Sequence, residues 1–190
     1  MTRHTITAVA AIAVAATTVA AFAHGGATGV VKERMDAMGA MQKATKALTE
    51  MMRGQTQYDA AAVREHAVTI RSHAGEAMTE LFPEGSNGMP SEARDEVWSD
   101  WDQFSALADR LERLSKGLEK AAGNQPGGDA GSASGTASMM GSHSMMGTSM
   151  MGGDADMPND EMLAQMPADA VFGMVAQTCS ACHTQFRIEK

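Results

Sequence analysis

Near its end the chain reads Phe172-Gly173-Met174-Val175-Ala176-Gln177-Thr178-Cys179-Ser180-Ala181-Cys182-His183-Thr184-Gln185-Phe186-Arg187. Apolar residues and cysteines recur there every three or four positions, which is the spacing of one face of an α-helix. The residues on this face are Phe172, Val175, Cys179, Cys182 and Phe186. Pro167 suits the first turn of such a helix. We therefore expect the chain to end in an amphipathic helix that carries both of its cysteines.

The two cysteines and the histidine that follows them form the sequence Cys-x-x-Cys-His at positions 179–183. This sequence is the attachment motif of c-type haem. Two thiols three residues apart lie on one side of a helix, where both reach the vinyl groups of one porphyrin. The motif predicts one covalent haem c, linked through thioethers to Cys179 and Cys182, with His183 as the proximal iron ligand.

Two other uses of a Cys-x-x-Cys pair have less support in the sequence. A structural zinc site needs a second pair of ligands, and no second pair is visible. A dithiol oxidoreductase places its cysteines at the start of a helix beside a βαβ pattern, which this sequence lacks. The histidine directly after the second cysteine favours haem over both alternatives.

Three further segments show helical periodicity, and they span residues 29–53, 59–80 and 91–122. Residues 81–88, between the second and third segments, are dense in Pro and Gly and predict a loop. Short connections between the first three helices favour antiparallel neighbours. The predicted fold is all-α: an antiparallel four-helix bundle with covalently bound haem c near the C-terminus. Residues 24–122 supply its first three helices, and residues 159–190 supply the haem-binding helix.

The composition agrees with an α-rich fold and narrows the class of partner. Only 4% of the residues are aromatic, and Ala and Met dominate the apolar residues, so a β-sandwich or barrel is disfavoured. The 23 acidic residues outnumber the 15 basic ones, which gives a net charge of −8. Because no cluster of Lys or Arg is visible, neither nucleic acid nor an anionic membrane surface is expected as the main partner.

The start of the chain has the features of a secretory signal peptide. Arg3 precedes a mainly apolar run over residues 6–23, and this run ends in the small-x-small sequence Ala21-Phe22-Ala23. We expect residues 1–23 to be removed after Ala23 and the mature protein to function in the periplasm without membrane insertion. The alternative is an uncleaved anchor, for which the run is short and rich in Ala and Thr.

Residues 123–158 differ in composition from the rest of the chain. They include nine Gly and no Val, Ile, Leu, Phe, Tyr or Trp, so they predict a flexible Gly/Met/Ser-rich insert. The sequence Ser-Met-Met-Gly begins at Ser138, Ser144 and Ser149, and His143 lies between the first two copies. Thioether groups suit Cu(I), which makes weak copper or silver binding one interpretation. A neutral linker and a pool of oxidisable methionines are the alternatives.

Several motifs resemble those of the cytochrome c′ family, also called class II cytochromes c. The haem motif lies near the C-terminus and is followed by Phe186-Arg187, like the family's Cys-x-x-Cys-His-x-x-Phe-Arg ending. Residues 52–59 are similar to the family's Lys-Gly-x-x-x-Tyr/Phe-Asp junction, and residues 81–86 and the Trp98/Trp101 region also look like the family. The resemblance covers all four predicted helices but not the insert.

The resemblance also implies a candidate for the sixth iron ligand. In this family the residue over the open haem face lies four positions after an arginine of the first helix, and Arg34 places Met38 there. High-spin, gas-binding members carry a non-ligating apolar residue at this position, whereas low-spin members of the cytochrome c-556 kind carry Met. Met38 also suits core packing, and Met41 is the ligand if the register shifts by one turn. Arg34 and Arg187 are candidates for propionate contacts or for tuning the potential, with a solvated helix face as the alternative.

The first functional hypothesis is a periplasmic monohaem cytochrome that carries single electrons between donor and acceptor proteins and is not an enzyme. Ligation by His and Met raises the reduction potential of haem iron and suits electron transfer. One alternative is a high-spin cytochrome c′ that binds NO or CO at an open sixth site. Another is a copper-handling protein that works through the insert. The resemblance further implies that a homodimer could form through the first two helices.

Overall fold

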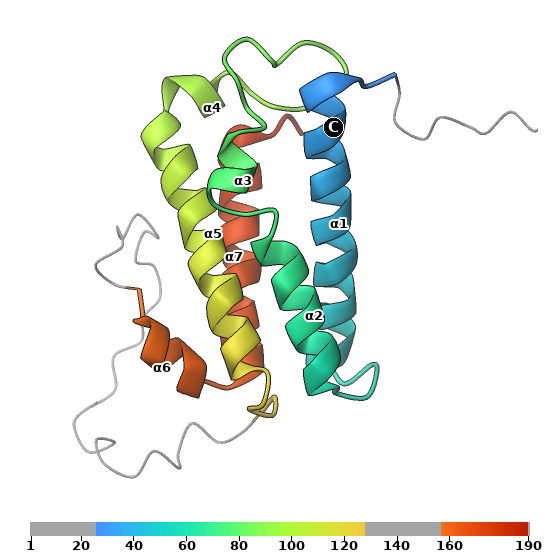
Figure 1. Cartoon of the computed structure of the whole chain (residues 1–190), viewed down its shortest axis with the longest axis vertical. Helices are drawn as coiled ribbons and strands as arrows, with labels where there is room; N and C mark the ends of the chain where they lie inside the picture. Colours follow the sequence, from blue (N-terminus) through green and yellow to red (C-terminus); the bar gives the residue numbers. More distant parts are fainter. Residues whose placement is uncertain (1–25, 128–156, 190) are drawn as a thin grey trace, which may run out of the picture.

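The computed structural model describes residues 26–127 and 157–189 (Figure 1). The four longer helices are α1 (Gly29–Met52), α2 (Ala60–Arg71), α5 (Trp101–Ala121) and α7 (Ala168–Phe186). The short helices are α3 (Glu76–Thr79), α4 (Glu96–Ser99) and α6 (Asp160–Gln165). None of the helices in the described ranges is both long enough and apolar enough to cross a membrane.

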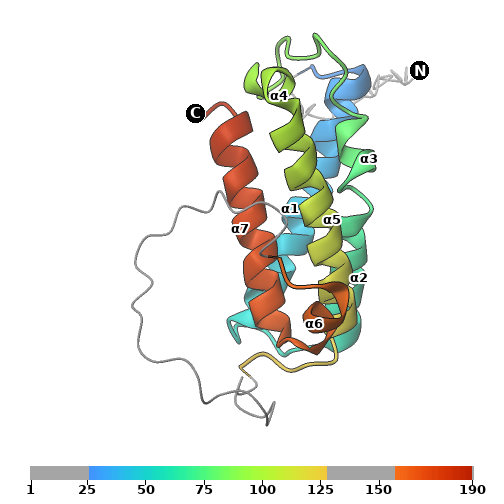
Figure 2. The same cartoon turned by 90° about the vertical axis from the view of Figure 1, so that its left-hand side faces the viewer.

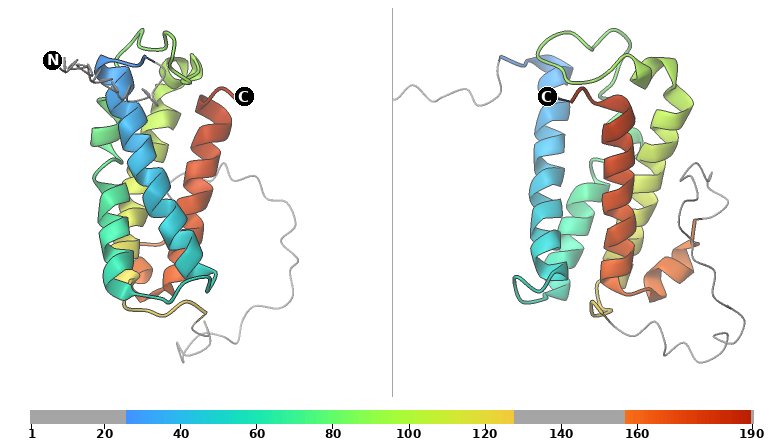
Figure 3. Two further views of the ribbon diagram at one scale, coloured as in Figure 1. Left: turned by 90° about the vertical axis from the view of Figure 1, so that its right-hand side faces the viewer. Right: turned by 180° about the vertical axis from the view of Figure 1, so that it is seen from behind.

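The longer helices form an antiparallel bundle, in which each runs opposite to the next one along the chain (Figures 1 and 2). Helix α5 is central because it packs against both α2 and α7, and α1 packs against α2. The start of α1 and the end of α7 lie at the same end of the bundle (Figure 3). This arrangement confirms the predicted all-α four-helix bundle.

The core consists of one apolar stripe along each longer helix. On α5 the largest buried members are Phe104, Leu111, Leu114 and Leu118, and each is at most 5% exposed. Their spacing of three or four residues is the pattern seen in the sequence. Burying each of these side chains contributes roughly 1.5–3 kcal/mol, so this stripe supplies a large part of the bundle's stability.

The predicted second helix, residues 59–80, is interrupted between α2 and α3. Asp59 caps α2 as an N-cap, since its side chain accepts hydrogen bonds from two backbone N–H groups of the first turn. Gly75 then adopts a φ of +57°, which an L side chain rarely tolerates, and its N–H donates to the carbonyl oxygen of Ala108 at 3.0 Å. A Cβ atom at this position would lie 2.2 Å from Oε2 of Glu112. The close approach to α5 breaks the helix, and apolar spacing does not reveal that contact.

The predicted third helix, residues 91–122, begins later than expected. Helix α4 begins at Glu96, and Asp100, with φ −125° and ψ 49°, separates it from α5. Residues 91–95 are not helical, because they make tertiary contacts with α1 and with the end of α7. The predicted helix was therefore wrong for residues 91–95, because their polar groups form hydrogen bonds with other helices.

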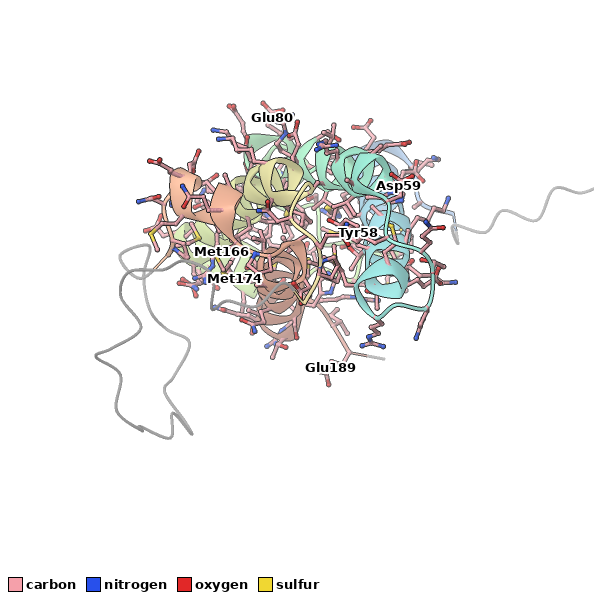
Figure 4. All side chains as sticks on the ribbon, turned by 90° about the horizontal axis from the view of Figure 1, so that it is seen from below. Tyr58, Asp59, Glu80, Met166, Met174 and Glu189 are labelled. Carbon is pink, nitrogen blue, oxygen red and sulfur yellow. The ribbon has the colours of Figure 1, made fainter. Side chains whose placement is uncertain are left out.

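The predicted signal peptide, residues 1–23, lies outside the described residues, as do the Ser-Met-Met-Gly copies and most of the insert at residues 123–158. Asn124, which was predicted to lie in that insert, belongs to the bundle. The side-chain amide of Asn124 donates to the carbonyl oxygens of Ala164 at 2.9 Å and Met166 at 2.7 Å. The hydroxyl of Tyr58 donates to the Ala122 carbonyl oxygen at 2.8 Å at the same end of the bundle (Figure 4). These contacts join the end of α5 to the segment that leads into α7.

Helix α6 is too short for apolar spacing to predict it, although a local signal exists. The side chain of Asn159 caps the helix by accepting from the backbone N–H of Met162 at 2.9 Å, and Asp160 and Glu161 occupy its first turn. Leu163, the fully buried residue of this helix, packs against Gly117 of α5. The N-cap and the acidic first turn are the features that could have located this helix in the sequence.

A substitution at Gly117 tests how closely α6 packs on α5. A Cβ atom at this position would lie 2.8 Å from Cβ of Leu163, so the two helices would have to separate. We expect Gly117→Ala to lower the free energy of unfolding by about 1–3 kcal/mol in chemical denaturation. The control is Gly173→Ala on α7, where the added Cβ meets no described atom within 4 Å apart from its own chain neighbours and the nearby backbone of its helix. Helix propensity predicts that this control gains up to about 1 kcal/mol, and equal effects at the two sites would contradict the close packing.

Candidate haem site

The predicted haem-attachment residues all lie on the last two turns of α7. Cys179 and Cys182 are half-buried, pack against the hydrophobic core and do not form a disulfide. Because they are three residues apart in a helix, both thiols lie on the same side of α7. His183 follows directly and is exposed. The structure thus brings two core-facing thiols and an accessible imidazole together at one end of the bundle.

The protonation states of these groups follow from their surroundings. Burial raises the pKa of the Cys179 thiol, and it raises the pKa of Cys182 to about 12, with the charge of Cys179 as a smaller cause. Both thiols are therefore neutral at physiological pH. Desolvation, and secondarily the positive charge of Arg187, lowers the pKa of His183. The neutral imidazole that results is the form that binds a metal ion.

Met38, the predicted distal ligand, lies on α1, which runs beside α7 (Figure 3). Its side chain is half-buried and packs against the hydrophobic core. Met41, the ligand predicted for a shifted register, is only 7% exposed and belongs to the core itself. Of the two methionines, Met38 is the more exposed residue.

Arg34 is a buried residue, so the alternative of a solvated helix face is wrong for it. It is 4% exposed, and burial lowers its pKa. Its guanidinium group donates to Ser86 Oγ at 2.9 Å, to the Leu81 carbonyl oxygen at 3.4 Å, and to the Ser86 carbonyl and Ser91 Oγ. It also lies 4.8 Å from the centroid of the Phe82 ring. These partners show that Arg34 holds the segment 81–91 against α1, whereas its predicted propionate contact stays a prediction.

Arg187 connects the end of α7 to the segment before α4. Its side chain forms an exposed ion pair with Glu92, with Nη2 to Oε2 at 2.7 Å and Nε to Oε2 at 2.9 Å. Two backbone hydrogen bonds of 2.9 Å flank this pair, from Arg94 N–H to the Phe186 carbonyl and from Ile188 N–H to the Glu92 carbonyl. Its predicted contact with a propionate also stays a prediction.

Sequence reasoning missed the segment that connects the helices carrying the two predicted iron ligands. Ser91 accepts from Arg34 of α1, and the next residue, Glu92, pairs with Arg187 at the end of α7. Arg34 lies four residues before Met38, and Arg187 lies four residues after His183. No sequence motif marks Ser91 or Glu92 for this role, because only the tertiary structure brings them to both helices.

The residues present fit a covalently attached haem. The two thiols are unlinked and lie one helical turn apart, and the imidazole of His183 makes no hydrogen bond to another of the described residues. The described part of the chain contains no group of three or more His, Cys, Asp or Glu that could hold a metal. The donor set of α7, two thiols followed by an imidazole, is the set that c-type haem uses.

Replacing Arg34 by alanine tests its role in holding the segment 81–91. We expect Arg34→Ala to lower the free energy of unfolding by about 2–3 kcal/mol, because buried oxygen atoms lose a charged donor. Hydrogen exchange should also become faster in residues 86–91. The control is Arg94→Ala, because Arg94 pairs with Glu96 at an exposed position and should cost less than about 1 kcal/mol. A comparably small effect at Arg34 would mean that its hydrogen bonds do not hold this segment.

Comparison with known proteins gives a family and a fold. A family model described as Cytochrome C' matches residues 29–144, a span that includes α1 to α5 and ends before the haem motif. A cytochrome c-556 from Agrobacterium tumefaciens (strain II Chrys) is 26% identical over 167 residues, which are 85% of this chain and 99% of that protein.

Solved structures of cytochromes c′ share the fold. Cytochrome c′ from Rhodopseudomonas palustris matches with a TM-score of 0.58 and 21% identity, covering 86% of this chain and 99% of that one. A nitric oxide complex of a mutant cytochrome c prime from Alcaligenes xylosoxidans has a TM-score of 0.55 and 24% identity, with coverages of 85% and 94%. The family match over more than half of the sequence shows that the chain belongs to the cytochrome c′ family of non-enzymatic haem proteins.

Proposed function

We propose that this protein is a periplasmic monohaem cytochrome that carries single electrons between a donor and an acceptor protein. Cys179 and Cys182 would hold the haem, and His183 and Met38 would bind its iron. The observation that supports this proposal is the position of Met38: this half-buried residue lies on α1, the helix beside the one that carries His183. The match to a cytochrome c-556 along nearly that protein's whole length supports the same branch of the family.

The chemistry of the two axial residues suits an electron carrier. A bound haem c would supply a one-electron Fe(III)/Fe(II) couple. Thioether sulfur is a soft ligand, and a His/Met pair raises the reduction potential relative to two nitrogen ligands. Two ligands from the packed bundle would stay bound in both oxidation states, so little reorganisation would accompany electron transfer.

The surrounding residues support that role by fixing the two ligand helices. Arg34 anchors the start of α1 to Ser86 and Ser91, and the neighbouring Glu92 pairs with Arg187 at the end of α7. A packed framework of this kind limits the relative movement of Met38 and His183, which is what a six-coordinate site requires. The predicted Cu(I) binding by the insert stays a separate proposal.

A potentiometric titration of the holoprotein tests the proposed function. We expect one reversible one-electron transition with low-spin optical spectra at both ends, because both axial ligands stay bound. A high-spin spectrum in either oxidation state would contradict the proposed carrier.

Members of the family are typically periplasmic. We therefore expect the mature chain to begin after Ala23, and mass spectrometry of the secreted protein measures where it begins.

A further inference from the structure

A hollow of about 460 Å³ lies on the surface where α3, α4 and the start of α5 meet. We call it the tryptophan hollow. Its main lining residues are Glu80, Phe82, Pro83, Glu84, Trp98 and Trp101. The indole N–H of Trp98 donates to the Phe82 carbonyl oxygen at 2.9 Å, which fixes that ring in the wall. Trp101 is 38% exposed and presents an indole ring to solvent.

The segment of sequence that forms the tryptophan hollow is strongly acidic. Residues 76–105 contain eight acidic side chains and one basic side chain, a net charge of −7 within a chain whose total is −8. The basic one, Arg94, is paired with Glu96. Glu80 and Glu84 are exposed and form no ion pair with another of the described residues, and Glu80 lies at the outer edge of the bundle (Figure 4). The charges of Glu80 and Glu84 are therefore not neutralised by ion pairs within the described part of the chain, whereas Glu92 of the same segment pairs with Arg187.

Indole rings beside carboxylates recognise one kind of side chain well. Lys and Arg place a cation over an aromatic face, lay an aliphatic stem along apolar surface and pair with carboxylates. An acidic surface also steers a basic protein toward it and speeds the encounter. The chemistry of the hollow thus matches a basic residue on the surface of a positively charged protein.

A row of aromatic contacts connects the tryptophan hollow with α7. The ring centroids of Trp101 and Phe104 are 5.6 Å apart, and those of Phe104 and Phe186 are 5.4 Å apart. Phe186 lies one helical turn after His183 on α7. A protein docked at the hollow would therefore contact Trp101, and the rings of Phe104 and Phe186 connect Trp101 with the helix that carries the haem motif.

We propose that the tryptophan hollow is the docking site for a Lys or Arg side chain on a basic protein redox partner. This inference rests on the proposed electron-carrier function and names the class of partner that the carrier meets. The negative surroundings steer the partner, and the indole rings with Glu80 and Glu84 hold the basic side chain.

Electron transfer to a basic acceptor tests the charged part of the docking site. The ferrous holoprotein is mixed at low ionic strength with ferric mitochondrial cytochrome c, a small protein with a lysine-rich surface. We expect the double variant Glu80→Gln and Glu84→Gln to lower the second-order rate constant about tenfold. The matched control, Glu65→Gln with Glu161→Gln, removes two exposed charges from α2 and α6 and should change it less than about twofold. Equal losses in both double variants would overturn the hollow as the docking site.

A binding measurement tests the aromatic part without any electron transfer. With both proteins ferrous, the indole N–H signals of the chain's two tryptophans, which both line the hollow, report on docking in nitrogen-15 NMR spectra. We expect both signals to shift on addition of the acceptor, and Trp101→Ala to weaken binding about fivefold. Indole signals that stay in place while other signals shift would locate the partner elsewhere and overturn the proposal. If acetyl-lysine amide bound as tightly as mitochondrial cytochrome c, the proposal that the partner is a protein would be overturned.

The two readouts separate failure of the docking site from failure of the proposed function. If the indole signals shift and the variants weaken binding, but no electron reaches the acceptor, the docking site stands and the electron-carrier function is wrong. If electrons are transferred at a rate that the hollow variants do not change, the electron-carrier function stands and the docking site is wrong.

Discussion

The Met38→Ala variant is expected to convert a low-spin haem protein into a high-spin one that binds CO readily. If Met38 binds the iron as proposed, CO must displace its thioether in the wild-type protein, and only the small fraction of iron without this ligand is free to bind CO. Removing the thioether opens the sixth position, and we expect the ferrous variant to bind CO at least about a hundredfold more tightly. Optical titration with CO measures this change, and the ferric spectrum of the variant should lose its far-red sulfur-to-iron band.

The control for Met38→Ala is the same substitution at Met41, one helical turn along α1. Met41 is 7% exposed and packs in the core, so Met41→Ala should lower the free energy of unfolding by about 2–5 kcal/mol while the spectrum stays low-spin. The reverse pattern, with high-spin iron only in the Met41 variant, would show that the ligand register is shifted by one turn. An unchanged spectrum in both variants would exclude both methionines as ligands.

Replacing Phe104 by alanine is expected to cause a large loss of stability. Phe104 is 2% exposed, and its ring lies 4.8 Å from the Phe82 centroid and 5.4 Å from the Phe186 centroid. Truncation removes these contacts and leaves a cavity where α5, α7 and the segment after α3 meet. We expect Phe104→Ala to lower the free energy of unfolding by about 3–5 kcal/mol in denaturant titrations of the holoprotein.

Two further variants are compared with Phe104→Ala. One makes a smaller change at the same position, and the other removes a neighbouring ring. Phe104→Leu keeps most of the apolar volume and should cost less than Phe104→Ala, by a margin of at least about 1 kcal/mol. Trp101→Ala removes a ring that is 38% exposed and should cost less than about 2 kcal/mol. If Phe104→Ala were no more costly than Trp101→Ala, Phe104 would not be the centre of this aromatic group.

The sequence was sufficient to predict the helices whose register follows from simple periodicity. Helix α1 ends at Met52, one residue before the predicted end, because Gly54 adopts a positive φ of 67° that stops the helix. Helix α7 carries the cysteines on the predicted face, because residues three apart share one side of a helix. In both helices local spacing and the tertiary contacts favour the same structure.

The errors arise where a tertiary contact overrides local helical preference. The break at Gly75 depends on the backbone of Ala108, and no spacing rule indicates a contact between residues so far apart in the sequence. Residues 91–95 follow a helix-start pattern, yet the partners of Ser91 and Glu92 are Arg34 and Arg187 on other helices. For the same reason, the sequence could locate Arg34 one turn before Met38 but could not show that its guanidinium group binds the segment 81–91.

An optical spectrum of the wild-type holoprotein, recorded in the ferric and ferrous states before and after addition of CO, tests the central claim most directly. Ligation by His183 and Met38 predicts a low-spin ferrous spectrum with sharp bands, a weak far-red sulfur-to-iron band in the ferric form, and little response to CO. Broad high-spin bands and ready binding of CO would contradict Met38 as a ligand and would identify a gas-binding cytochrome c′ instead.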